Sequence, residues 1–179
     1  DADRAALAPR VEAALRTGID KSPQRSLKAA YFAAFRRMAT THDGVAYLER
    51  IWRRQSIVSG LPFAEPDEIA MAQELAVRNV PATEAILTDQ LARISNPDRR
   101  ARFAFISPAL SADVATRDRF FESLANVDNR RHEPWVIDAL ASLNHPLRAR
   151  HAQAYITPSL NLLREIEETG DIFFPSRWT

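Results

Sequence analysis

The strongest constraint on this fold is where proline and glycine stand along the chain. Several of the 11 prolines occur where a helical hydrophobic pattern begins, as at Ser22-Pro23, Asn96-Pro97 and Pro134. Proline is favoured at the first helical position because its missing N–H has no intrahelical partner there. Alternating strand patterns of useful length do not occur. The chain is therefore predicted to be all-helical, with its glycines at helix ends or turns: Gly18, Gly44, Gly60 and Gly170.

Hydrophobic spacing and these breaks together predict around nine or ten short helices. We expect them at residues 3–16, 22–38, 43–54, 66–78, 81–94, 96–106, 111–124, 134–143 and 146–168, the last either continuous or broken at Thr157-Pro158. Three of these helices have clear apolar faces, made by Leu27, Ala30, Tyr31, Ala34, Phe35 and Met38, by Val45, Leu48, Ile51 and Trp52, and by Val136, Ala139, Leu140 and Leu143.

A short internal echo suggests how the helices are arranged. "NPDRR" at 96–100 is repeated as "NVDNRR" at 126–131, an offset of about 30 residues that matches one helix pair. Many short helices with tight turns suit stacked antiparallel pairs better than a four-helix bundle. We predict a single helical-repeat domain over residues 1–179, folded as a HEAT- or armadillo-like α-solenoid.

Composition narrows the functional classes. The net charge is +1, and each arginine cluster has acidic neighbours, which argues against a nucleic-acid surface. No apolar run approaches the length of a membrane span, so neither nucleic acid nor membrane is expected as a partner. The absence of cysteine excludes disulfides and thiolate metal sites. The chain begins without a signal peptide or an initiator methionine, and we expect it to be a fragment of a longer protein.

A search for reactive groups identifies no catalytic or metal-binding residue. A helical zinc hydrolase site needs two histidines one turn apart, as in H-E-x-x-H. His132-Glu133 is followed by Pro134, and position 136 is Val136, which indicates a turn entering a helix. His145 and His151 are too far apart to share a helix face in this way. The sequence also lacks a G-x-S-x-G elbow and a glycine-rich phosphate loop.

Three distinctive strings do point to a family. "NPDRRARFAFISPALSADVATRDRFFESL" at 96–124, "HEPWVIDALASLNHPLRA" at 132–149 and "YITPSLNLLREIEETGDIFFPSRW" at 155–178 resemble, in this order, the end of bacterial zinc aminopeptidases of the aminopeptidase N family. The segment 46–78 is similar to the preceding part of the same region. The first forty residues match only in helical character, so the strong resemblance covers roughly half of the chain.

The resemblance implies a non-catalytic role. In that family the zinc ligands and the catalytic glutamate lie upstream, and none of their motifs occurs here, so no cofactor is expected in this chain and zinc is expected in the parent protein. The family's C-terminal helical region packs on the catalytic domain, encloses the cavity and limits peptide access. The catalytic domain is therefore the expected partner, and peptide substrate an indirect one. Two alternatives remain: a free-standing helical-repeat scaffold that binds a protein or peptide, and a weaker one, an arginine-rich nucleic-acid binder.

Two groups of residues are candidates for contacts. Arginines at helix starts or in turns could bind a peptide carboxylate, or could instead pair with neighbouring acids; they are Arg130, Arg131 and Arg148. The terminal aromatics could cap the last helices or reach a neighbouring domain, because large aromatics gain from burial wherever it is available; they are Phe173, Phe174 and Trp178.

Overall fold

The computed structural model describes residues 2–178, and these residues contain helices and turns but no β-strand. The predicted all-helical class is confirmed. The chain divides into two compact units, Asp1–Arg78 and Asn79–Thr179. None of the described helices is long and apolar enough to span a bilayer. The expectation of one helical-repeat domain over residues 1–179 stays a prediction.

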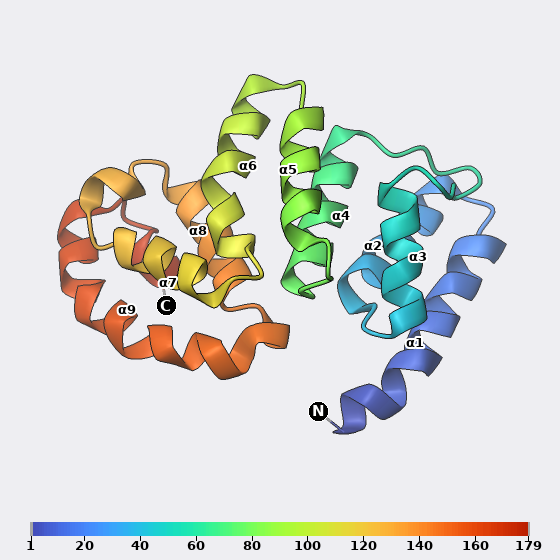
Figure 1. Ribbon diagram of the computed structural model, residues 1–179, viewed down its shortest axis with the longest axis horizontal. Helices are drawn as coiled ribbons and strands as arrows, with labels where there is room; N and C mark the ends of the chain where they lie inside the picture. Colours follow the sequence, from blue (N-terminus) through green and yellow to red (C-terminus); the bar gives the residue numbers. More distant parts are fainter. Residues whose placement is uncertain (1, 179) are drawn as a thin grey trace. The chain divides into compact units, whose positions relative to one another are not determined.

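The first unit consists of four helices (Figure 1). They are α1 (Ala2–Lys21), α2 (Arg25–Met38), α3 (His42–Trp52) and α4 (Glu65–Val77). Helix α1 packs along α2, and α4 contacts both α2 and α3. The centre of this unit is apolar, and each large side chain buried there stabilises the fold by about 1.5–3 kcal/mol. It includes Phe35, Leu48, Trp52, Met71 and Leu75.

The second unit contains six α-helices among its described residues, of which α9 is long and α10 is short (Figure 1). Its α-helices are α5 (Thr83–Arg93), α6 (Pro97–Leu110), α7 (Val114–Ser123), α8 (Glu133–Leu143), α9 (Ala149–Thr169) and α10 (Pro175–Trp178). Two 3-10 turns, η1 (Val127–Arg130) and η2 (Pro146–Arg148), precede α8 and α9. Helix α6 packs against α5, α7 and α8, while α10 lies against α8 and α9. Pro158 lies inside α9, which is continuous and follows a curved path (Figure 1).

The predicted boundary between the first two helices is wrong. Helix α1 runs through Gly18 to Lys21, and α2 begins at Arg25. Gly18 does not end the helix; a Cβ atom there would lie 2.5 Å from the ring of Tyr31 in α2, so the glycine permits close helix packing. The hydroxyl of Ser22 donates to the carbonyl of Gly18 at 2.5 Å and extends α1 instead of capping α2.

The predicted start of the seventh helix is also wrong. Helix α6 continues past Pro108 to Leu110, and the N-cap of α7 is Asp113, whose carboxylate accepts the backbone N–H of Thr116. A proline inside a helix removes one backbone hydrogen bond, and α6 nevertheless continues for two residues beyond Pro108. Ser111, the expected cap, is the C-cap of α6.

The predicted apolar faces are partly confirmed. All four inward residues expected in α8 are buried, and so are Leu48, Ile51 and Trp52 of α3. In α2 the expectation is wrong at three positions, because Leu27 is 44% exposed, Met38 is 51% exposed and Ala30 is exposed as well. The buried residues of α2 are Phe32 and Phe35, which lie on a narrower face than the sequence pattern indicates.

Candidate functional site

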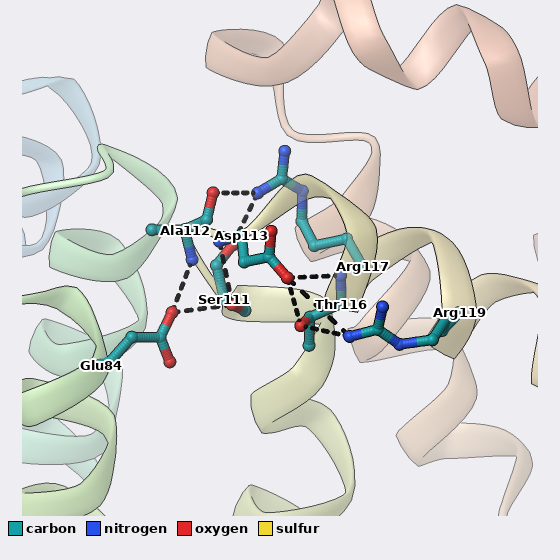
Figure 2. A network of polar contacts seen from close by, with 7 residues as sticks. All are labelled: Glu84, Ser111, Ala112, Asp113, Thr116, Arg117 and Arg119. Atoms are coloured by element: carbon teal, nitrogen blue, oxygen red, sulfur yellow. Dashed lines mark hydrogen bonds and ion pairs between the residues drawn. The ribbon is translucent and has the colours of Figure 1, made fainter.

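The turn between α6 and α7 contains a network of polar contacts, which Figure 2 shows from close by. The carboxylate of Glu84, on α5, accepts the hydroxyl of Ser111 at 2.7 Å and the backbone N–H of Ala112 at 2.9 Å. Asp113 then accepts the backbone N–H and the hydroxyl of Thr116 at 2.9 and 2.6 Å. The hydrogen bonds from Thr116 hold the pKa of Asp113 below its ordinary value. Glu84 and Asp113 therefore bind backbone N–H groups in this turn and at the start of α7.

The carbonyl groups of the same turn are bound by Arg117 of α7. This side chain is buried, and its Nη1 donates to the carbonyls of Ser111 at 2.7 Å and Ala112 at 3.0 Å (Figure 2). The carbonyls at a helix C-terminus have no intrahelical donor and carry partial negative charge, so a guanidinium is well suited to them.

Arg148, one of the predicted contact residues, lies at this turn as well. It is 5% exposed, and burial, followed by the charge of Arg117, lowers the pKa of its guanidinium to about 10. It donates to acceptors within the second unit: the carbonyls of Ala109 at 2.8 Å, Leu110 at 2.8 Å and Ser111 at 3.3 Å, and the side-chain oxygen of Asn79 at 3.0 Å. The structure thus places Arg148 as a cap on the end of α6.

The other two predicted arginines have different surroundings. Arg130 is 3% exposed; its Nη1 donates to the carbonyl of Leu124, just after α7, and its Nη2 binds the carboxylate of Glu165 on α9. The side chain of Arg131 is 74% exposed and pairs with Asp128 at 2.8 Å. The structure therefore brings Arg130 and Arg148 to helix ends and leaves Arg131 at the surface. Binding of a peptide carboxylate by these residues stays a prediction.

A second cluster, which the sequence analysis missed, joins α7 to α9. Asp118 Oδ1 accepts the hydroxyl of Tyr155 at 2.7 Å and lies 2.7 Å from Nε2 of His151. The Tyr155 ring is stacked on Phe121 with ring centroids 4.5 Å apart. No sequence motif marks this cluster, because Asp118 and His151 lie on separate helices, 33 positions apart.

The protonation of this cluster follows from its contacts. Burial, with the hydrogen bond to Asp118, raises the pKa of the Tyr155 hydroxyl well above its ordinary value. At Asp118 burial acts to raise the pKa, but the hydrogen bonds from Tyr155 and His151 and nearby positive charge outweigh it, so the net shift is downward. Asp118 is therefore held as the negative partner that ties α9 to α7.

The first unit contains a turn of the same design. Between α2 and α3, the carboxylate of Glu12 on α1 accepts the backbone N–H groups of Thr40 at 2.6 Å and Thr41 at 2.9 Å, and also the Thr41 hydroxyl. Arg78, directly after α4, donates to the carbonyls at the end of α2: Arg36 at 3.0 Å, Arg37 at 2.8 Å and Ala39 at 2.5 Å. We call each such turn, with its carboxylate and its arginine, a corner: Glu12 and Arg78 form the first, Glu84 and Arg148 the second.

The terminal aromatics divide into two groups. Phe174 and Trp178 are each 2% exposed, with ring centroids 5.9 Å apart, and the indole N–H of Trp178 donates to the carbonyl of Ser159 on α9 at 3.0 Å. Phe173 is 70% exposed. Part of the tail therefore packs on the last helices of the second unit, and part faces solvent.

The histidines have separate contacts. His42 lies beside Asp43, His132 is stacked on Trp135, His145 accepts the backbone N–H of Leu147, and His151 contacts Asp118. Within residues 2–178, no three His, Asp or Glu side chains are grouped so that they could hold a metal ion. The described residues therefore do not fit a zinc ligand set.

Comparison of the chain with protein-family models, curated proteins and solved structures finds no match.

Proposed function

We propose that this chain is the non-catalytic C-terminal domain of a zinc aminopeptidase of the aminopeptidase N family. In this role it packs on the catalytic domain and limits the access of peptides to the active site. The ordered strings at 96–124, 132–149 and 155–178 support the family assignment. Zinc and the groups that activate water belong, in this proposal, to a part of the protein outside these 179 residues.

The observation that carries the proposal is that buried charged side chains bind backbone groups at helix ends and turns. Arg117, Arg130 and Arg148 all donate to carbonyls at or just after helix ends, and Glu12 accepts N–H groups at a turn. Such groups stabilise helix ends and inter-helix turns. Because these contacts stabilise the helix ends and turns, they suit a domain of fixed shape. Such a domain can exclude folded substrates sterically without reactive groups of its own.

The two corners support the finer proposal of a HEAT- or armadillo-like helical repeat. In each corner a glutamate on the first helix binds the turn between the second and third helices, and an arginine after the fourth helix binds the end of the second. The matching positions are about 70 residues apart: Glu12 and Glu84, Pro23 and Pro97, Glu65-Pro66 and Glu133-Pro134, Arg78 and Arg148. A four-helix unit repeated in this way suits a stacked array.

The test is the size and metal content of the native polypeptide. We expect an antibody raised against this chain to detect a band several times larger than 20.2 kDa in the source cells. That polypeptide, once purified, should hold about one zinc per chain and release N-terminal residues from peptides. The isolated 179-residue chain, as the control, should do neither.

Two results would contradict the proposal. A native band at 20.2 kDa would mean that the domain exists alone, and would favour the free-standing scaffold instead. Stoichiometric zinc in the isolated chain would show that its histidines, despite their separate contacts, can hold a metal ion. This result would contradict the placement of zinc outside these 179 residues.

A further inference from the structure

Helix α9 buries few side chains for its length. It spans 21 residues, all of which the structure describes, and the buried ones are Ala152, Tyr155, Ser159 and Ile166. Helix α8 also buries four residues, all apolar, within a length of 11. A helix that packs on a core through one apolar face normally buries about three to four residues in every two turns. Apolar burial alone therefore does not account for the position of α9.

Pro158 divides α9 into two parts that are held differently. Proline has no N–H, so the carbonyl of Ala154 cannot accept the usual backbone hydrogen bond from position 158. Beyond the proline the tail holds the helix, because the indole N–H of Trp178 donates to the carbonyl of Ser159 at 3.0 Å. We call the part of α9 that precedes the proline the strap: residues 149–157.

Both ends of the strap are fixed. Arg148, the residue before it, is buried and donates to the carbonyls of Ala109 and Leu110 at the end of α6. Ser159, shortly after it, is buried under Trp178. A helical segment between two fixed ends can unwind without displacing its neighbours, and such local opening is favoured where few side chains are buried.

A single acid on α7 binds the strap. Asp118 Oδ1 accepts the hydroxyl of Tyr155 at 2.7 Å and lies 2.7 Å from Nε2 of His151. The ring of Tyr155 is stacked on Phe121 with ring centroids 4.5 Å apart. Ala152 is the other buried residue of the strap, and its side chain is a single methyl group. The contacts of Tyr155 are therefore the main attachment of the strap to α7.

Two like charges lie close to this attachment. Arg117 and Arg148 are 3% and 5% exposed, and both donate to the carbonyl of Ser111. Burial and the hydrogen bond to Asp118 raise the pKa of the Tyr155 hydroxyl, while the nearby charge of Arg117 acts to lower it. Keeping two neighbouring guanidiniums out of water costs free energy. This cost opposes the closed position of the strap.

We propose that the strap opens and closes by itself, as a local conformational device of the second unit, and that Asp118 holds it closed. In the open state Tyr155 and His151 leave Asp118, and the strap unwinds between its two fixed ends. Water then reaches the guanidinium of Arg117. The part of α9 beyond the proline stays in place. The opening needs neither zinc nor a partner domain, so it is independent of the proposed function.

Hydrogen exchange, followed by mass spectrometry on the native polypeptide that contains this chain, tests the proposal. Peptides from the strap and from residues 159–169 belong to one helix, so the second set is an internal reference for the first. We expect the strap to exchange about tenfold faster than residues 159–169, after correction for intrinsic rates. Equal rates in the two parts, or slower exchange in the strap, would overturn the proposal.

Two substitutions should change the exchange of the strap in opposite directions. Tyr155→Phe removes the hydroxyl that Asp118 accepts but keeps the stacked ring, and exchange in the strap should become about tenfold faster. Pro158→Ala restores a backbone donor for the carbonyl of Ala154, and exchange in the strap should become about tenfold slower. An unchanged rate in either variant would contradict the attachment or the weak point on which the strap depends.

Glu165→Gln is the matched control. Glu165 accepts Nη2 of Arg130 at 2.6 Å and lies beyond the proline, so its loss should speed up exchange in residues 159–169 and leave the strap unchanged. Equal acceleration of both parts would show that α9 opens as one piece, which overturns the strap as a separate element. Exchange in α8 should stay the same in all three variants. Faster exchange of α8 in Tyr155→Phe would mean that the whole unit is destabilised, and would also overturn the proposal.

Discussion

The two corners use the same side-chain types, but they neutralise charge differently. In the first corner, Glu12 is 4% exposed and accepts three donors, and Arg78 has a carboxylate partner in Glu74 at 2.7 Å. In the second corner the glutamate, Glu84, is exposed. The first corner is thus closed by a buried acid and a paired base, each satisfied within α1–α4.

The second corner contains two arginines where the first has one. Arg148 and Arg117 both donate to the carbonyl of Ser111, and the charge of Arg117 contributes to the lowered pKa of Arg148. Asp118, next in the chain to Arg117, binds Tyr155 and faces His151 on α9. The comparison shows that the turn in the second unit is bound by one more arginine, and that the acid next to this arginine, Asp118, also contacts a further helix, α9.

Removing the corner arginines should have the largest effect and should distinguish the two corners. Arg78→Met leaves four carbonyls and the carboxylate of Glu74 without this donor, so we expect the free energy of unfolding to fall by about 4 kcal/mol. Arg148→Met removes a cap but also relieves repulsion from Arg117, and the expected loss is about 3 kcal/mol. Urea unfolding measures both.

The control for these substitutions is Arg37→Met. The Arg37 side chain is exposed on the same helix end, and its loss should change the free energy of unfolding by less than about 0.5 kcal/mol. If Arg148→Met proved more damaging than Arg78→Met, the repulsion between the two guanidiniums of the second corner would be unimportant.

The tail, which has no counterpart in the first unit, gives the next largest effect. Trp178→Ala should lower the free energy of unfolding by about 3 kcal/mol, because it removes a buried indole and leaves a cavity. Phe173→Ser, at an exposed position of the same segment, should change it by less than about 0.5 kcal/mol. Truncation after Gly170 should lower the melting temperature markedly, and an unchanged melt would contradict the burial of the tail in the second unit.

The sequence predicts the class of the fold and several of its helices, for physical reasons that are local. Periodicity locates α3, and periodicity with proline placement locates α8, since these signals act within one helix. The inward residues expected in these two helices are buried, except Val45 of α3. The same signals misplace the helix ends at Ser22 and Ser111. Both serines have side chains that can cap a helix, but their hydroxyl groups donate elsewhere. The Ser22 hydroxyl donates to the carbonyl of Gly18, and the Ser111 hydroxyl donates to the carboxylate of Glu84.

The corners themselves could not be predicted, because their partners are distant in sequence. Glu12 lies 28 positions from Thr40, and Arg78 lies 39 positions from Ala39. A glutamate on a helix surface and an arginine after a helix are ordinary features of a solvated face. Only the three-dimensional packing decides that these particular charges are buried against a turn.

Removing the corner glutamates should give a smaller but graded effect. Glu12→Ala deprives two backbone N–H groups and a hydroxyl of their buried acceptor, and we expect a loss of about 2 kcal/mol in the free energy of unfolding. Glu84→Ala should cost about 1 kcal/mol, because the exposed Glu84 binds two donors and only one of them, the Ser111 hydroxyl, belongs to a buried residue. Urea unfolding checks the ratio, and equal losses would show that burial does not distinguish the corners.

An equally small effect is expected from Asp118, the acid next to Arg117, and its pH dependence gives the sharpest test. The pKa of Asp118 is lowered from the ordinary 3.8 by its hydrogen bonds and by nearby positive charge, so the folded state favours the carboxylate. The stability that this provides is present above the ordinary pKa and is lost as the pH falls through the lowered one. Asp118→Asn should therefore cost about 1 kcal/mol near pH 7, a modest value because the side chain is 38% exposed.

The difference between Asp118→Asn and the unmodified chain should disappear in acid, once Asp118 is protonated in both the folded and the unfolded states. Urea unfolding at several values between pH 7 and pH 2.5 measures this convergence. The same pH series on Glu12→Ala serves as the comparison, because this substitution also removes an acid, but one in the first corner and far in sequence from α9. A constant difference across the whole range would show that Asp118 holds α9 through shape alone, and that the extra charge of the second corner does not contribute.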